Sequence, residues 1–185
     1  MHFTLTFRGS LPANGDPAAK QLIRRQLHAQ LKHLWSLPPL NKHTNTLLSE
    51  EQTIRPCIIS RVGTFRFAPL VSTKLYLIAK LQLFLLRPEP PGRLITQGGD
   101  IDNRLKTLFD ALRMPRVLAE IPANDKPRND EDPFFCLLED DALITEVDVK
   151  TEVLLDPSAG ASEAQLLIRV ETAAIESPWL DLRFL

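Results

Sequence analysis

The stretch GGDIDNRLKTLFDAL, residues 98–112, joins a glycine pair, two closely spaced aspartates and an amphipathic helix pattern. A helix start needs only one capping carboxylate, and two carboxylates this close repel each other. In extended backbone, alternate side chains point to the same side, so we expect Asp100 and Asp102 to converge. Lys106, one helical turn beyond Asp102, is expected to face the same region. The spacing therefore predicts a paired-carboxylate site at the start of a helix.

A second acidic cluster, EDD at residues 139–141, stands immediately before an alternating strand pattern at residues 143–153. Together with the first pair it would supply the oxygen ligands that Mg²⁺ prefers. Each piece alone has a simpler interpretation, because Asp102 or Asn103 can cap a helix and an acidic triplet before a strand is commonly a solvated turn. The occurrence of both clusters in a fixed order around one helix favours the metal site.

The rest of the chain has strand and helix periodicities that predict an α+β fold, with a small mixed sheet and flanking helices. Apolar residues alternate, or a hairpin pattern occurs, in segments 3–8, 57–70, 75–85, 143–153 and 165–173. A helix is predicted from Pro17 to Trp35, with Asp16 as its N-cap. The length of 185 residues and the 44% apolar content fit a single domain over residues 1–185.

Residues at about 113–138 include a stretch rich in proline, asparagine and charge, with NDKPRNDEDP at its centre. Such a composition offers little apolar surface to bury, so we expect a mobile insertion here. Two cysteines, Cys57 and Cys136, lack the spacing of a zinc site or a disulfide framework. Their pattern and the absence of a signal-peptide or membrane-spanning pattern predict a cytoplasmic protein.

The net charge of −1 conceals two opposed halves. Residues 1–96 carry 13 Lys and Arg against 4 Asp and Glu, whereas residues 97–185 carry 9 against 19. This asymmetry indicates a polyanionic partner for the basic half and metal for the acidic half. The basic face of the 17–35 helix comprises Lys20, Arg24, Arg25 and Lys32, which either contact DNA phosphates or form a solvated or dimer-facing surface.

The segment DIDNRLKTLFDAL followed by EDDALI resembles the RusA family of Holliday junction resolvases. The family signature is Asp-x-Asp-Asn, a lysine four residues after the second aspartate, a helix containing Asp-Ala-Leu, and Asp-Asp before a strand. The resemblance implies that Asp100, Asp102 and Asp141 bind metal, that Lys106 is catalytic with them, and that Asp140 is a possible additional acid. It also implies a RusA-like homodimer that uses Mg²⁺ to cut branched DNA by paired nicks.

The chemistry of these residues suits phosphodiester hydrolysis, which needs an activated water and neutralisation of developing negative charge. The leading hypothesis is therefore an Mg²⁺-dependent endonuclease acting on branched DNA. Two alternatives remain open: a non-catalytic RusA-fold protein that binds DNA or another protein, and a nuclease of the same chemistry with another nucleic-acid substrate. Metal-dependent nicking separates the nucleases from the binding protein, and preference for junctions over duplex separates the two nucleases.

Overall fold

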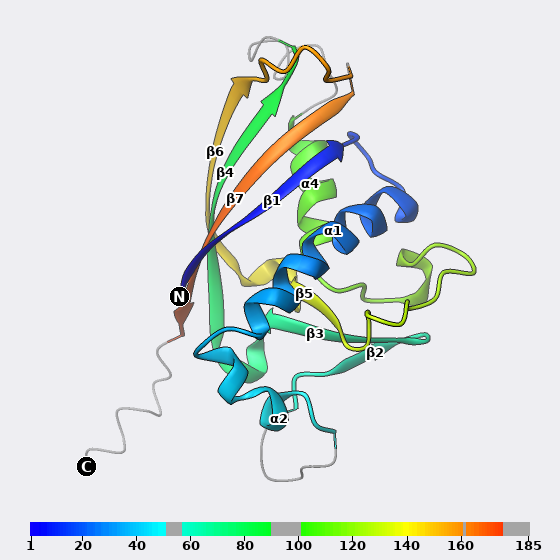
Figure 1. Cartoon of the computed structure of the whole chain (residues 1–185), viewed down its shortest axis with the longest axis vertical. Coiled ribbons are helices and arrows are strands. Elements are labelled where there is room, and N and C mark those ends of the chain that lie inside the picture. The colour runs from blue at the N-terminus through cyan, green and yellow to red at the C-terminus, as the bar shows by residue number, and fades with distance from the viewer. Residues whose placement is uncertain (51–56, 90–100, 161, 176–185) are drawn as a thin grey trace.

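The computed structural model describes residues 1–50, 57–89, 101–160 and 162–175 (Figure 1). The strands are β1 (His2–Ser10), β2 (Ser60–Val62), β3 (Phe65–Val71), β4 (Leu77–Arg87), β5 (Phe134–Leu138), β6 (Ile144–Val153) and β7 (Glu163–Ala174). The α-helices are α1 (Pro17–Trp35), α2 (Thr44–Leu47) and α4 (Ile101–Leu112), and the 3₁₀ turns are η1 (Leu40–Lys42), η2 (Thr73–Leu75), η3 (Leu118–Glu120) and η4 (Asp141–Leu143). These elements confirm the predicted α+β class.

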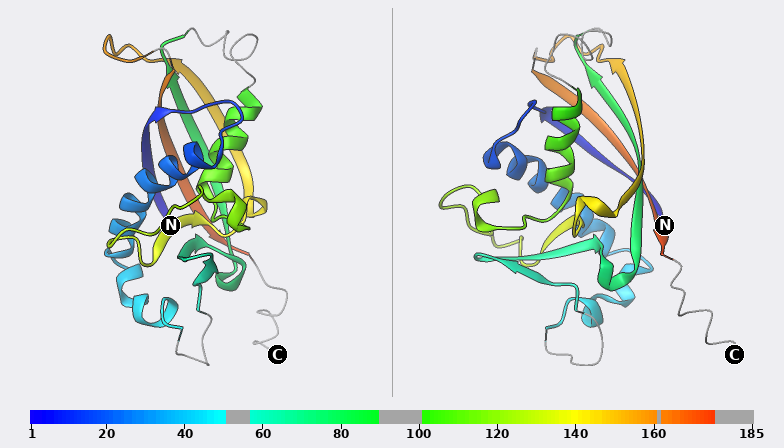
Figure 2. Two further views of the ribbon diagram at one scale, coloured as in Figure 1. Left: turned by 90° about the vertical axis from the view of Figure 1, so that its right-hand side faces the viewer. Right: turned by 180° about the vertical axis from the view of Figure 1, so that it is seen from behind.

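The strands of the described residues form two mixed sheets where the sequence predicted one. The larger sheet has the order β1-β7-β4-β6, with β6 parallel to β4 and the other neighbours antiparallel. The smaller sheet has the order β2-β3-β5, with β3 and β5 parallel. The alternation in β4 predicted its two faces, because Ala79, Leu81, Leu83 and Leu85 are buried while their neighbours are partly exposed. Both α1 and α4 lie on the same side of the larger sheet (Figures 1 and 2).

Helix α1 begins and ends at the residues that the sequence predicted. The Asp16 side chain accepts a hydrogen bond from the Ala19 backbone N–H at 2.7 Å, as a capping residue does, and Pro17 occupies the first turn. Its core-facing stripe includes the buried side chains of Ile23, Leu27 and others at helical spacing. No helix of the described residues, α1 included, combines the length and apolarity needed to cross a membrane.

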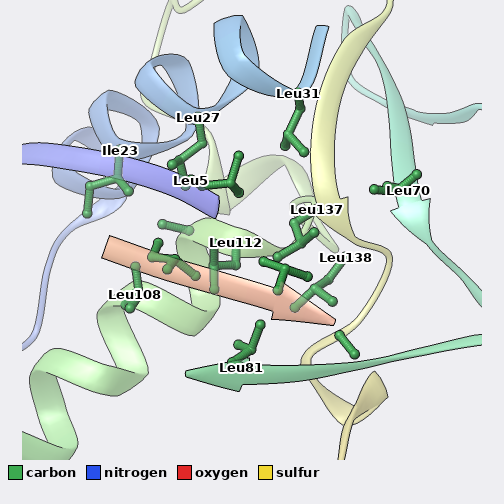
Figure 3. Packing of buried hydrophobic residues seen from close by; sticks show 14 of the residues in the cluster. Leu5, Ile23, Leu27, Leu31, Leu70, Leu81, Leu108, Leu112, Leu137 and Leu138 are labelled. Atoms are coloured by element: carbon green, nitrogen blue, oxygen red, sulfur yellow. The ribbon is translucent and has the colours of Figure 1, made fainter. Parts of the chain in front are cut away.

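One hydrophobic cluster joins the helices to both sheets (Figure 3). Leu27 and Leu31 of α1 and Leu108 and Leu112 of α4 point into the same interior as residues of β1, β4 and β5. Leu108 is 0% exposed, so the apolar stripe of α4 fixes how this helix is rotated about its axis. The polar residues at the start of α4 are therefore held on its solvent side.

The segment after α4 differs from the predicted insertion at its carboxyl end. All five residues of β5, FFCLL, are buried, so the expectation of an insertion extending to residue 138 was wrong there. The preceding residues include the turn η3 and bind α1 through Glu131, whose side chain is 3% exposed and accepts a hydrogen bond from Arg25. Composition alone underestimated this order, because the charges of the segment have partners elsewhere in the fold.

Candidate functional site

The Asp-x-Asp-Asn motif leads into α4, and its second aspartate lies in the first turn of that helix. Asp102 and Lys106 are both exposed, and neither side chain has a hydrogen-bond or ion-pair partner among the described residues. Their i, i+4 spacing places them on the same side of the helix. Asp100, the predicted partner of Asp102, lies outside the described residues. A carboxylate and an ammonium group thus share an open face of α4.

The adjacent face of α4 is fixed by the loop before α1. The Gly15 backbone N–H donates to Thr107 Oγ1 at 2.9 Å, and a Cβ on Gly15 would lie 2.6 Å from Thr107 Cγ2. The glycine is therefore needed for this close approach. A pocket of about 190 Å³ opens beside the contact, and its lining includes Lys20, Asn103 and Lys106. The structure thus brings together one of the predicted DNA contacts and the predicted catalytic lysine.

The second acidic cluster, residues 139–141, lies at the start of η4, which contacts α4 and leads directly into β6 (Figure 2). The Asp140 side chain caps η4 by accepting a hydrogen bond from the Ala142 N–H at 2.9 Å. This bond, together with Arg116, holds the pKa of the Asp140 carboxyl below its ordinary value. Glu139 faces elsewhere, because its carboxylate accepts hydrogen bonds from the N–H and hydroxyl of Thr73.

Arg116 links the two aspartates of this cluster. Its Nε and Nη2 donate to the two carboxylate oxygens of Asp140 at 3.0 and 2.8 Å, and Nη2 also donates to Asp141 Oδ1 at 2.7 Å. The geometry is a bidentate guanidinium–carboxylate pair extended to a second carboxylate. No spacing rule pointed to Arg116, because it follows α4 in the segment that composition had marked as an irregular insertion.

The structure does not bring Asp102, Asp140 and Asp141 together as a ligand set. Within the part of the chain that the structure describes, no three His, Cys, Asp or Glu side chains lie close enough to hold a metal ion. Asp102 is in the first turn of α4, whereas Met114, beyond the other end of the helix, donates its N–H to the Leu138 carbonyl near the second cluster. A complete set of metal ligands must therefore include residues other than Asp102, Asp140 and Asp141.

The donor chemistry nevertheless fits a divalent cation in one respect. Carboxylate oxygens are the ligands that Mg²⁺ prefers. Asp140 and Asp141 already hold the positive charge of the Arg116 guanidinium between them. The pair is therefore suited to binding a cation, although its ligands are incomplete among the described residues.

The basic residues predicted to contact DNA differ in their surroundings. Arg24 is 1% exposed and donates to the backbone carbonyls of Asp110 and Arg113 at 2.7 and 3.2 Å. Burial lowers its pKa to about 10. The prediction that Arg24 contacts DNA is therefore wrong, because a side chain enclosed between α1 and α4 cannot reach a phosphate.

The other three basic residues of α1 are more accessible but have partners within the fold. Lys20 forms an ion pair with Asp110 at 2.7 Å. Arg25, with a side chain only 16% exposed, pairs with Asp125 and Glu131. Lys32 donates to the Asp130 carbonyl at 2.7 Å. Their contact with DNA stays a prediction, and it would require these bonds to be shared or broken.

Asp110 and Arg113 belong to a buried charge network that the sequence did not reveal. Burial would raise the pKa of the Asp110 carboxyl, but hydrogen bonds from Lys20 and Arg113 hold it below its ordinary value. Arg113 also pairs with Glu120 at 2.7 Å. The network ties the end of α4 to α1 and η3, and it thereby fixes the backbone that leads to Arg116.

A comparison of the chain with protein-family models and with curated proteins finds no match.

Proposed function

We propose that the protein is an Mg²⁺-dependent endonuclease that cleaves branched DNA by metal-assisted phosphodiester hydrolysis. The observation that carries the proposal is the arrangement at the start of α4, where Asp102 and Lys106 lie one turn apart on an open helix face with no partner among the described residues. Side chains without a structural task in this position are available to a ligand. The resemblance of the surrounding motif to the RusA signature supplies the reaction class.

The metal would be held by Asp100, Asp102 and Asp141, with Asp140 as a further acid. When bound, Mg²⁺ activates a water and neutralises charge on the phosphate. The assignment follows the motif, and the capacity of the second cluster to hold the cationic group of Arg116 supports it.

Lys106 is proposed to stabilise the negative charge that develops on the phosphate. The lysine lines the pocket shared with Lys20 and Asn103, where the protein presents two ammonium groups and an amide near the open face of α4. A cation fixed there acts on the transition state more than on the bound substrate. Because Lys20 is already paired with Asp110, Lys106 is the free ammonium of this pocket among the described residues.

The first test compares a synthetic four-way junction with a linear duplex of matched sequence, each incubated with Mg²⁺ and with EDTA. Nicking of the junction that requires Mg²⁺ is the expected result. The Asp102→Asn variant should retain its fold, because an amide can replace the carboxylate at the start of a helix, and it should lose cleavage. Cleavage by the variant at the parent rate would refute the assignment of Asp102.

A non-catalytic protein of the same fold is the second candidate, and one observation favours it. Among the described residues the acidic side chains do not gather into a three-ligand site, and Arg116 occupies the two acids of η4. Junction binding without nicking at any Mg²⁺ concentration would establish this alternative. Nicking of duplex and junction at equal rates would instead indicate another nucleic-acid substrate.

The proposal includes a homodimer, because paired nicks on the two sides of a junction require two active sites. Sedimentation of the free protein tests this part separately, and a monomer that stays monomeric on junction DNA would contradict it. A cytoplasmic location is proposed on the cysteine pattern alone, with Cys136 buried and Cys57 partly buried as free thiols.

A further inference from the structure

The two edges of the larger sheet differ in how their backbone groups are satisfied. The outer N–H and C=O groups of an edge strand are unpaired and can bind another chain. At the β1 edge, Gln30 of α1 accepts from the Thr6 N–H at 2.9 Å and donates to the Thr6 carbonyl at 2.7 Å. Gln26 makes the same two bonds to Arg8, at 3.4 and 3.1 Å. At the β6 edge, no described residue makes bonds of this kind, so this edge is open.

Apolar side chains accompany the open edge of β6 (Figure 1). Val147 and Val153 are 41% and 39% exposed, and Leu155, just beyond the strand, is 87% exposed. Val147 lies opposite the buried Leu81 of β4, so this row is on the side of the sheet that carries the helices. An apolar row beside unpaired backbone is suited to the addition of a further strand.

We propose that the β6 edge pairs antiparallel with the β6 edge of a second copy of this chain, about a twofold axis at Thr151. The inference rests on the proposed function for the homodimer itself, and it names the surface of that dimer. The Leu154 N–H donates to the Arg87 carbonyl at the end of β4 at 2.7 Å. Successive peptide groups point to opposite edges of a strand, so the N–H and C=O groups of Thr151 point away from β4.

The apolar row is self-complementary in this register. With the axis at Thr151, Val149 lies opposite Val153 of the partner subunit. Val147 then lies opposite Leu155 of the partner subunit, and the twofold axis generates each contact twice. Apolar pairs directly opposite each other on one face are among the contacts that stabilise paired strands. The side chains that β6 exposes in the monomer would therefore cover one another in the dimer.

The charges on the other face of β6 favour the same axis. With the axis at Thr151, Lys150 lies opposite Glu152 of the partner subunit, again twice. Moving the axis to Lys150 or to Glu152 places that charge opposite its own copy, and moving it to Val149 places Glu152 opposite Glu146 of the partner subunit. Like charges directly opposite each other destabilise a strand pair. Charge complementarity thus selects the register that also pairs the apolar row.

Pairing in this way has a consequence for the proposed nuclease. Directly opposed residues of two paired strands point to the same side, so the axis is perpendicular to the sheet. The two four-stranded sheets would continue into each other, and α4 of both subunits would lie on the same side. Two proposed sites on one side of a continuous sheet could reach the two strands of a single junction.

The test is sedimentation equilibrium of the DNA-free protein, comparing the parent with Lys150→Glu, Glu152→Lys and the double variant Lys150→Glu/Glu152→Lys. Each single variant should raise the dimer dissociation constant about tenfold or more, because two opposite-charge pairs become like-charge pairs. The double variant restores opposite charges and should return the constant close to the parent value. Glu171→Lys is the matched control, because this exposed carboxylate on the interior strand β7 forms no ion pair among the described residues. The control should leave the constant unchanged.

The outcomes separate this inference from the proposed function. A parent dimer whose constant is the same in all of the variants would overturn the β6 interface and leave the homodimer standing. Tighter dimerisation of Glu152→Lys, or a double variant as weak as the single ones, would overturn the pairing about Thr151. A parent that is monomeric at every concentration but nicks junctions would overturn the inference and leave the endonuclease standing. A dimer that responds as expected but nicks no DNA would support the inference and refute the endonuclease. Circular dichroism of each variant verifies that the fold is retained.

Discussion

At the scale of single residues, burial separates the cations that hold the fold from those available for chemistry. Arg24 belongs to the first kind, because its two hydrogen bonds satisfy backbone carbonyls of Asp110 and Arg113 inside the protein. Arg24→Met should lower the free energy of unfolding by about 1–3 kcal/mol, the usual cost of leaving buried acceptors unpaired. Urea unfolding measures the loss. A variant as stable as the parent would show that these carbonyls find other donors.

Lys106 is one of the cations that are available for chemistry. An exposed lysine with no partner among the described residues contributes little to stability, so Lys106→Met should unfold at the parent's urea concentration. Its catalytic assignment predicts that single-turnover junction cleavage falls about 10²-fold or more while junction affinity, measured in Ca²⁺, falls only slightly. A loss of affinity as large as the loss of rate would make Lys106 a phosphate anchor.

At the scale of elements, a histidine joins α1 to β5. The Phe135 backbone N–H donates to His28 Nδ1 at 2.8 Å, so Nδ1 carries no proton, and Nε2 lies 3.2 Å from the Asp130 carbonyl, to which it donates. This arrangement requires the neutral imidazole. Burial lowers the pKa of His28 below its ordinary 6.5, with smaller opposing effects from the hydrogen bonds.

The lowered pKa of His28 fixes the sign of its contribution to the pH dependence of stability. As the pH falls below about 6.5, the unfolded chain protonates His28 before the folded protein does, so stability present at pH 7 declines toward pH 5. His28→Gln should remove this component, because an amide oxygen and N–H can replace both ring contacts without titrating. Unfolding free energies at pH 7 and pH 5 test this, and an unchanged slope in the variant would assign the dependence to other groups.

The segment between α4 and β5 is bound to α1 by a nearly buried ion pair. Glu131 is 3% exposed and contacts Arg25 at 2.8 Å. Glu131→Gln should destabilise the protein by about 3 kcal/mol, because it leaves the poorly exposed Arg25 with one fewer counter-charge. Arg128→Met, which alters an exposed neighbour 3.9 Å from Glu131, should cost less than about 0.5 kcal/mol. Equal effects in a urea titration would contradict the buried pair.

Periodicity predicted the elements better than composition predicted the segment between them. Apolar residues repeat at regular positions along α1, β4 and α4. The same repeat shows which residues of each element are buried. The 113–133 segment has no such repeat, since its order comes from pairing with residues about a hundred positions earlier, such as Arg25 with Glu131. The motif predicted the open face of α4, but the contact of Arg116 with Asp140 depends on the path of that segment.

At the scale of the whole molecule, the opposed charges of the two halves pair in part with each other, several of them at the surface. The basic residues of the first half pair with acids of the second through Arg8–Asp156, Arg8–Glu163, Lys20–Asp110, Arg25–Asp125, Arg25–Glu131, Arg66–Asp132 and Lys80–Glu146. Five different Lys and Arg side chains of the first half are therefore paired with acids of the second half among the described residues. Each of these five cations would have to share or break an ion pair in order to contact a phosphate.

This arrangement predicts a shallow salt dependence of DNA binding. Each phosphate neutralised contributes about −0.9 to the slope of log K against log salt concentration, so fewer than about four contacts should give a slope shallower than about −4. Fluorescence anisotropy of a labelled junction in Ca²⁺ at several salt concentrations measures this slope. If Lys106 contacts a phosphate, Lys106→Met should make the slope shallower by about 0.9, the contribution of one phosphate. A markedly steeper slope would mean that the α1 ion pairs open when DNA binds. In that case Arg25→Met would reduce the slope, whereas a parent-like slope in that variant would confirm that Arg25 remains paired with Glu131 in the complex.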